Sequence, residues 1–227
     1  MNTNIFLDNN QNSSKIKYIK VFGERNTGTK LVNRLISKNS DFKVLNHGDN
    51  DIPRERLNSL FENTDLFEKP LSRSLSVTIR KLAFNRLIDQ QRKDEYAENY
   101  GWKHSRVDVS HLKLSPRFDS TLFIFLIRNP WRFISGLYKR PYNLFPPPHG
   151  ELSDFISTSF LANERDHLLC NFVENPIQFW NIKVKSYFDC KIILKNSLIC
   201  YYEKIMESPQ NFLDLLKPDG NVYQEIT

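Results

Sequence analysis

The chain divides into segments whose apolar residues recur at strand spacing or at helix spacing. Residues 15–23 alternate polar and apolar side chains and end at a glycine, which predicts a strand. Residues 122–127 read Leu-Phe-Ile-Phe-Leu-Ile, a continuous apolar run typical of a central parallel strand that is buried on both faces. Shorter extended segments are predicted at residues 42–46, 100–104, 191–194 and 197–202.

Segments with helical spacing separate these predicted strands. Residues 29–37 carry an apolar helix face, and residues 130–138 begin with a proline, which is favoured in the first turn of a helix. Residues 51–98 are predicted to be mostly helical and polar, and residues 176–188 and 208–216 to be helices, the last with Ser208 at its N-cap. Because strands alternate with helices, we expect a three-layer α/β/α domain around a central parallel sheet.

The length of 227 residues suits one domain with a full core, which we expect to span residues 15–227. Residues 1–14 are rich in asparagine, lack a periodic pattern and are predicted to be a disordered tail. The longest apolar stretch, residues 122–127, is too short to span a bilayer, and no secretion signal precedes it. The three cysteines have no metal-type spacing, so we expect reduced, buried thiols in a cytoplasmic protein.

The formal net charge of +6 fits an anionic partner: a nucleic acid, a membrane surface, or an acidic small ligand or glycan. The basic residues are spread along the chain, and the densest group, residues 69–93, has the helical spacing of a solvated helix face. A nucleic-acid binder would concentrate its basic residues on one face, so we expect no nucleic acid as partner.

Two loops are candidates for an anion site because ligands of parallel α/β sheets bind beyond the carboxyl ends of the strands. In the first, Gly23 and Gly28 have the spacing of a Walker A phosphate loop, but Thr29-Lys30 reverses the Lys-[Ser/Thr] order that holds phosphate and Mg²⁺ there. Such a turn still directs backbone N–H groups and a helix N-terminus at an anion. The alternative is a tight strand-to-helix turn that needs glycine for its geometry only.

The second loop follows the apolar strand at residues 122–127. Arg128 lies at the carboxyl end of this strand, and Ser135 lies seven residues later, inside the next predicted helix. An arginine can hold a phosphate through two parallel hydrogen bonds, and a serine adds a third donor. The alternative is a salt-bridged arginine and an ordinary helix serine. A metal-binding carboxylate, which a Walker-type triphosphatase needs at this strand end, is missing.

Together the two loops resemble those of the sulfotransferase family. Thr27-Gly28-Thr29 matches the Ser/Thr-Gly-Thr core of the family's 5′-phosphosulfate loop, and Arg128-Asn129-Pro130 with Ser135 matches its 3′-phosphate motif. Residues 199–216 are similar to the family's C-terminal strand, Tyr-Glu pair and helix. The resemblance implies a P-loop NTPase-like fold, 3′-phosphoadenylyl sulfate as donor, adenosine 3′,5′-bisphosphate as product, and no metal.

The resemblance also implies which residues bind the donor. Arg128 and Ser135 are expected to bind the 3′-phosphate. The 5′-phosphosulfate is expected to bind to the loop residues Arg25, Asn26, Thr27, Gly28, Thr29 and Lys30. Many family members carry a lysine where this chain has Asn26, so we expect Arg25 or Lys30 to supply the positive charge near the leaving group.

Sulfuryl transfer needs a base for the proton of the acceptor, and histidine titrates near neutral pH. Lys103-His104 resembles the Lys-x-His segment of cytosolic sulfotransferases without the spacer, so His104 is the predicted base, assisted by Lys103. His47 and the carboxylate of Glu24 are alternative bases. The remaining histidines are His111, His149 and His167.

The predicted function is therefore transfer of a sulfuryl group from 3′-phosphoadenylyl sulfate to a hydroxyl or amine of an acceptor. The acceptor is predicted to be a carbohydrate or a small metabolite. One alternative is a P-loop kinase or ATPase, which would bind ATP with Mg²⁺. Another is a non-catalytic nucleotide- or glycan-binding relative, and the departure at Asn26 keeps it open.

Overall fold

The centre of the molecule is a sheet of four parallel strands in the order β2-β1-β3-β6. The computed structural model describes residues 16–45, 96–141, 144 and 150–217. The strands are β1 (Tyr18–Gly23), β2 (Lys43–Val44), β3 (Thr121–Ile127) and β6 (Ser197–Tyr201). The protein is thus an α/β protein with a central parallel sheet, as its alternating pattern predicts.

The apolar run at residues 122–127 forms the middle of this sheet. Every residue of β3 is buried, and β3 pairs with β1 on one side and β6 on the other. A strand without a polar position is stable only where helices cover both faces, which is the reason for its continuous apolar sequence. The prediction of a central parallel strand here is confirmed.

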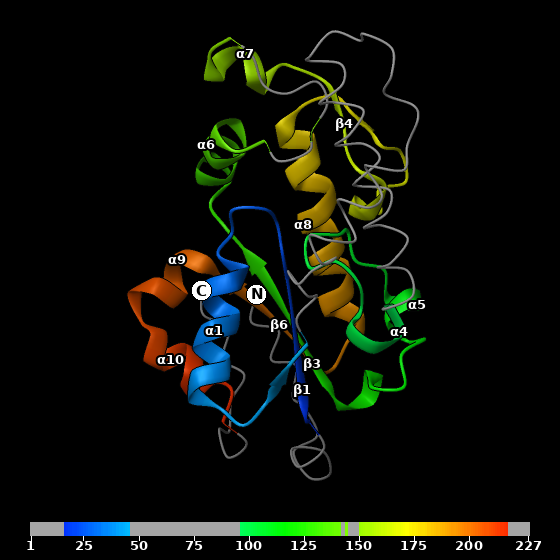
Figure 1. Cartoon of the computed structure of the whole chain (residues 1–227), viewed down its shortest axis with the longest axis vertical. Coiled ribbons are helices and arrows are strands. Elements are labelled where there is room, and N and C mark those ends of the chain that lie inside the picture. The colour runs from blue at the N-terminus through cyan, green and yellow to red at the C-terminus, as the bar shows by residue number, and fades with distance from the viewer. Residues whose placement is uncertain (1–15, 46–95, 142–143, 145–149, 218–227) are drawn as a thin grey trace, which may run out of the picture.

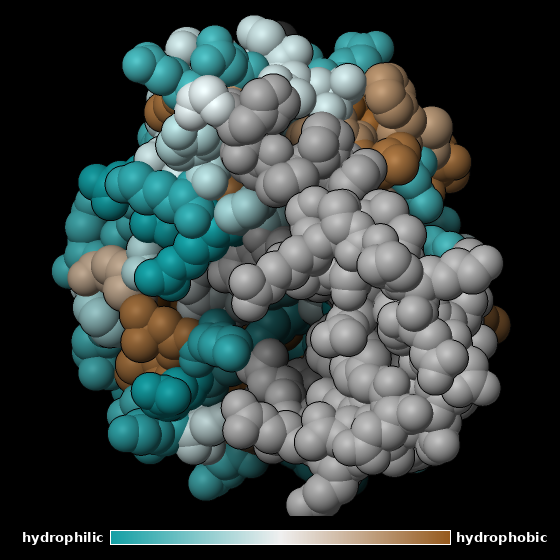
Figure 2. Space-filling view, turned by 45° about the horizontal axis from the view of Figure 1, so that its top comes forward, coloured by the Kyte–Doolittle hydropathy of each residue, from teal (hydrophilic) through white to brown (hydrophobic). Residues whose placement is uncertain are grey.

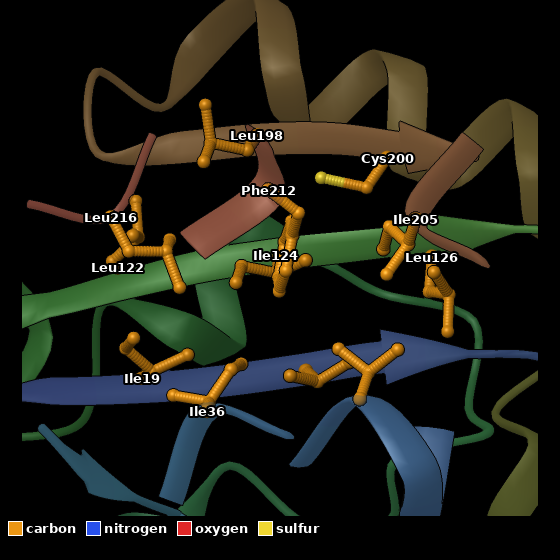
Figure 3. Packing of buried hydrophobic residues seen from close by; sticks show 12 residues of the cluster. Ile19, Ile36, Leu122, Ile124, Leu126, Leu198, Cys200, Ile205, Phe212 and Leu216 are labelled. Carbon is orange, nitrogen blue, oxygen red and sulfur yellow. The ribbon is translucent and has the colours of Figure 1, made fainter. Parts of the chain in front are cut away.

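Helices cover both faces of the sheet (Figure 1). On one face lie α1 (Thr29–Asn39), α9 (Tyr202–Glu207) and α10 (Pro209–Asp214). In Figure 3, Ile36 of α1 lies beside Ile19 of β1, and Phe212 of α10 lies beside Ile124 of β3. These contacts form one apolar cluster between this face of the sheet and its helices.

The other face packs against α5 (Val109–Leu112) and α8 (Pro176–Ile193). Alternate residues of β1 and β3 point to this side, among them Phe22 and Phe125, whose ring centroids are 6.1 Å apart. Phe125 also stacks on Tyr187 of α8 at 5.4 Å. The two apolar faces of the strands therefore bury separate clusters, one for each helical layer.

A third apolar cluster lies beyond one end of the sheet, where α6 and α7 are drawn in Figure 1. It gathers residues of α6 (Pro130–Lys139), α7 (Leu152–Ile156), the first half of α8, and the two-stranded antiparallel ribbon of β4 (Phe160–Leu161) and β5 (Phe172–Val173). Three short elements complete the described chain: α4 (Tyr96–Asn99), η3 (Phe118–Ser120) and η4 (Glu164–Asp166).

Several predicted elements differ from the structure. Residues 100–104 are a turn rather than a strand. Residues 191–193 are helical rather than extended, because α8 continues to Ile193 and buries Cys190 against the sheet; its C-cap, Leu194, has an extended backbone. The predicted strand at 42–46 is reduced to the two residues of β2. Helix α9 and the β4–β5 ribbon were not predicted. Of the predicted helix at 51–98, residues 51–95 lie outside the described residues.

Burial of the three cysteines is only partly as predicted. Cys190 and Cys200 are buried, and burial raises the pKa of each thiol to about 12. Cys170 is exposed, because it lies in the connection before β5 rather than in a core element. Each of the three is a free thiol in the structure.

Hydrophilic residues dominate the described part of the surface in Figure 2, with smaller apolar patches among them. Among the described residues, no helix is both long enough and apolar enough to cross a membrane.

A buried lysine on β1 connects the sheet to the turn at residues 100–104. Lys20 has no exposed surface, and its ammonium group donates hydrogen bonds to the carbonyl oxygens of Asn99 (2.5 Å) and Gly101 (2.7 Å). Because a buried cation needs acceptors for its protons, the segment that follows α4 is held against the sheet by these bonds.

We expect Lys20→Met to lower the free energy of unfolding by about 1–3 kcal/mol, because two buried carbonyl groups lose a charged donor while the apolar volume is kept. Lys17→Met, at an exposed position of the same segment, should change it by less than about 0.5 kcal/mol. Urea denaturation of both variants measures the difference. Equal effects would show that the buried ammonium does not hold the turn.

Candidate functional site

The order of the strands defines one crevice in the sheet. From β1 the chain crosses to β2 on one side, and it later returns to form β3 on the other side of β1. Ligands of open α/β sheets bind at such a switch point, outside the carboxyl ends of the strands. In Figure 1 the loop after β1 and the segment between β3 and α6 leave the sheet at this same end.

The loop after β1 is a tight turn in which two residues adopt a left-handed backbone. Asn26 has a φ of 63° and Gly28 a φ of 83°. The amide and the hydroxyl of Thr27 both donate to the carbonyl of Glu24, at 3.1 and 2.5 Å. A Cβ at residue 28 would lie 2.2 Å from Cε2 of Tyr202, so this position needs glycine for its φ and for the close ring.

Helix α1 begins directly after this turn, with Gly28 as its N-cap. The first N–H groups of an α-helix have no partner within the helix, and the helix dipole adds about half a positive charge there. The first turn of α1 contains no acidic residue, and no side chain of the described residues caps it. Thr29 is buried in this turn and Lys30 is exposed on it. This end of α1 therefore attracts anions.

The segment after β3 contacts the first loop. The guanidinium of Arg128 donates a hydrogen bond to the carbonyl of Asn26, lies over the ring of Tyr202 at 5.0 Å, and has its Nε 3.9 Å from a carboxylate oxygen of Glu203. Asn129 caps α6 by accepting from the next two amides at 3.0 and 3.3 Å. Residues about one hundred positions apart in the sequence are thus joined at the switch point.

A cavity of about 570 Å³ opens where these two loops meet. Its walls come from the first loop, the end of β3 and one face of α6: Asn26, Arg128, Trp131, Arg132, Ser135, Gly136, Lys139 and Arg140. Three of the predicted donor-binding residues, Asn26, Arg128 and Ser135, are brought together here. Gly136 lets the first loop approach α6 closely, since a Cβ there would lie 3.1 Å from Cβ of Asn26.

The cavity is strongly cationic. Arg132, Lys139 and Arg140 join Arg128 in its walls, and none of the lining residues is acidic. The opposite face of α6 is buried in the third cluster through Phe133 and Leu137. Sequence reasoning missed the three additional cations. The sequence did contain a signal for this cationic face, because residues 132, 135 and 139 are three and four positions apart and therefore share one face of a helix.

His104 lies at the other side of the first loop. Its Nδ1 is 2.5 Å from the carbonyl oxygen of Gly23, and the amide of Gly23 donates to the carbonyl of Lys103 at 2.9 Å. Since a carbonyl only accepts, Nδ1 carries the proton and Nε2 keeps the lone pair of the neutral ring. This is the tautomer a general base requires.

The surroundings of His104 favour its neutral form. Burial lowers the pKa of His104 well below its usual value, and the positive charge of Lys103 lowers it further. The bond to Gly23 opposes these effects, while Arg25 and Lys183 add to them. His104 is therefore unprotonated at neutral pH. Lys103, the predicted assistant, is buried beside it.

Arg25 differs from its predicted place at the phosphate. Its guanidinium is buried and forms two parallel bonds of 2.8 Å with the carboxylate of Asp166, and it stacks on Trp102 at 4.6 Å. These donors are directed into the protein, away from the cavity lining that contains Asn26. The structure thus gives Arg25 a supporting position behind the loop.

Asp166 belongs to a buried group of four charges, with Glu24, Arg25 and Lys183. Lys183 bonds to Asp166, and its Nζ lies 2.9 Å from a carboxylate oxygen of Glu24. Burial alone would raise the pKa of Asp166, but Arg25 and Lys183 hold it well below its usual range. For Glu24 burial outweighs the same two cations and raises its pKa, so this alternative base is committed to the buried group.

Neither Asp166 nor Lys183 was predicted as part of a site. Lys183 had a signal, because Phe179, Lys183 and Tyr187 recur every four residues on the buried face of α8. Asp166 had none, since η4 was not predicted and its partner Arg25 is far away in the sequence.

Other candidates lie away from the cavity. His111 is exposed on α5, and its ring is 6.4 Å from that of His167, which follows η4 in a left-handed conformation rather than lying in a helix. His47 and His149 lie outside the described residues. Trp131 is 65% exposed and lines the cavity, so its ring is open to a ligand.

Comparisons of the chain with protein-family models, with curated proteins and with solved structures found no match.

We expect Asp166→Asn to lower the free energy of unfolding by about 3–5 kcal/mol, because Arg25 and Lys183 would stay buried with too little opposing charge. Asp189→Asn is the matched control. Its pair with Lys185 on α8 is solvent-exposed, so the loss should stay near about 0.5 kcal/mol. Guanidinium denaturation of both variants measures the difference in the free energy of unfolding. A small effect of Asp166→Asn would contradict the description of a coupled buried group.

Proposed function

We propose that the chain is a sulfotransferase with a P-loop NTPase-like fold. It moves a sulfuryl group from 3′-phosphoadenylyl sulfate to a hydroxyl or amine of a carbohydrate or small metabolite. One observation carries the proposal: Asn26, Arg128 and Ser135, which the resemblance to sulfotransferases assigns to the two ends of one donor, line a single cationic cavity at the switch point of the sheet.

The dimensions and donors of the site support a nucleotide with two phosphate positions. A volume of about 570 Å³ lies within the range of small-ligand pockets. The 5′-phosphosulfate lies at the N-terminus of α1, where the positive end of the helix dipole favours an anion. The 3′-phosphate lies between Arg128 and Ser135. A guanidinium has five donors, so Arg128 holds this phosphate while it keeps its bond to Asn26.

The chemistry is an in-line displacement at sulfur. The acceptor oxygen forms a bond to sulfur while the bond from sulfur to the bridging phosphate oxygen breaks, and the electron pair of that bond stays with the phosphate. The acceptor proton moves to Nε2 of His104, the ring nitrogen that is free to take it. Charge that develops on the leaving phosphate is stabilised by the end of α1 and by Lys30, since Arg25 is occupied by Asp166.

A second candidate is a non-catalytic nucleotide-binding relative. It is favoured by one observation: Asn26 stands where many sulfotransferases have lysine, and the neighbouring Arg25 is turned into the buried group. Both candidates bind the donor nucleotide, and they differ in turnover.

We expect adenosine 3′,5′-bisphosphate to bind the chain with micromolar affinity in EDTA, measured by isothermal titration calorimetry. Arg128→Ala should weaken this binding about tenfold or more, because a charge-assisted pair of hydrogen bonds to the 3′-phosphate is lost. Arg34→Ala removes an equal charge from an exposed position of α1 and should leave the affinity unchanged.

ATP with Mg²⁺ is the competing ligand in this titration. Binding of ATP with Mg²⁺ and none of the bisphosphate would replace the sulfotransferase by a P-loop kinase or ATPase.

We expect His104→Ala to lower turnover by about 10²–10⁴-fold while bisphosphate binding stays unchanged. Because the pKa of His104 is lowered, the acid limb of kcat/KM should lie below pH 6.5. Release of the bisphosphate from the donor, with a panel of saccharides as acceptors, measures both. An acid limb above pH 6.5, or full activity of the variant, would assign the base elsewhere, and donor binding without turnover would favour the non-catalytic relative.

A further inference from the structure

Lys183 is the cation of the buried group that touches the candidate base as well as the phosphate loop. It has no exposed surface, although it lies in the middle of an 18-residue helix. Its Nζ donates to the carbonyl oxygen of His104 at 2.6 Å, bonds to Asp166, and lies 2.9 Å from Glu24. The ammonium group therefore donates hydrogen bonds to two of these partners and lies within ion-pair distance of the third.

These three partners belong to three separate segments around the site. His104 lies in the turn that docks on the end of β1, and Glu24 is the first residue of the loop that follows β1. Asp166 ends η4 and holds Arg25, the next residue of the loop, through two bonds of 2.8 Å. One side chain of α8 therefore fixes the turn of the base and the start of the phosphate loop relative to each other.

Stability alone does not account for this arrangement. Four buried charges lose their hydration, and replacement of such groups by apolar residues of similar volume is often neutral or stabilising. The ammonium group lies against aromatic rings, with Nζ 4.2 Å from the centre of the Phe179 ring and 5.9 Å from that of Trp102, so an apolar side chain of similar volume would have apolar neighbours in the same space. What an apolar residue would not supply is a directed donor to the carbonyl of His104.

We propose that Lys183 is a positioning residue, whose ammonium group sets the orientation of the His104 turn relative to the phosphate loop. The inference rests on the proposed function, in which Nε2 of His104 takes the acceptor proton. A base must lie within hydrogen-bond reach of the proton it removes, so a small rotation of this turn lowers turnover without loss of donor binding.

The experiment compares Lys183→Met and Lys183→Arg in the full chain. The readout is the titration of the His104 ring proton by NMR, assigned by its loss in His104→Gln. In Lys183→Met we expect the midpoint to rise by about one pH unit towards the usual value, because a nearby cation is lost and water reaches the ring. Lys103 and Arg25, the other cations near the ring, are unchanged in both variants. Lys183→Arg should keep the midpoint near that of the wild type.

One control and one replacement variant separate the possible results. Lys185→Met removes an exposed lysine from the same helix and should leave the midpoint unchanged. If Lys183→Met does not fold, Lys183→Met with Glu24→Gln removes one charge of each sign from the buried group and is used in its place. Turnover should fall at least about tenfold in the folded variant while bisphosphate binding stays within about twofold.

An unchanged His104 midpoint in a folded Lys183→Met protein would overturn the positioning role, whatever the effect on stability. Loss of bisphosphate binding together with turnover would do the same, since the site as a whole would then have collapsed. If the wild type itself binds no bisphosphate, the proposed function fails. The midpoint comparison then tests the link between Lys183 and the His104 turn by itself.

Discussion

The parallel pairing of β1 with β3 sets the position of the two candidate phosphate loops. The two strands run in register from Tyr18 and Thr121 to Gly23 and Leu126, and β3 ends one residue later, so the segments that follow them leave the sheet side by side. The loop that contains Gly28 and the turn that contains Arg128 therefore meet at this edge of the sheet. The two faces of β3 bury separate apolar clusters, which fixes α1 on one side and α8 on the other. A cavity at this edge therefore follows from the topology of the sheet.

Positive charge near this edge is divided between two environments. Arg25 and Lys183 are buried and matched by two carboxylates, so their charges hold the protein together behind the phosphate loop. The cations of α6 line the open cavity, and none of the described residues that line it is acidic. Buried cations that are paired with carboxylates hold the loop in place, and cations that line the cavity attract an anion. An anion site needs both. His104 lies beside the buried group, since Lys183 donates to its carbonyl oxygen, and burial with the neighbouring cations lowers its pKa and favours the neutral ring.

Much of the sheet and both loops could be predicted from the sequence, because a continuous apolar run, a glycine at a strand end and a proline at a helix start each have a local cause. Asn26, Arg128 and Ser135 were grouped through the resemblance to the sulfotransferase motifs, and the structure brings these three residues to one cavity. The place of Arg25 could not be predicted. Its direction is set by Asp166, which lies 141 residues away in an element without a sequence signal. Residues 191–193 were misassigned because the two isoleucines favour a strand, whereas α8 continues to Ile193 and buries Cys190 against the sheet.

The central claim is that the loops after β1 and β3 form one site for a nucleotide with two phosphate positions. An amide NMR titration of the full chain with adenosine 3′,5′-bisphosphate tests it most directly. The account predicts that the largest shifts fall together, with one saturation curve, on residues 26–30 and on 128–136. Shifts in only one of the two loops, or two different saturation curves, would contradict a shared site. Shifts spread over exposed lysines elsewhere would show that the basic chain binds the anion through net charge alone.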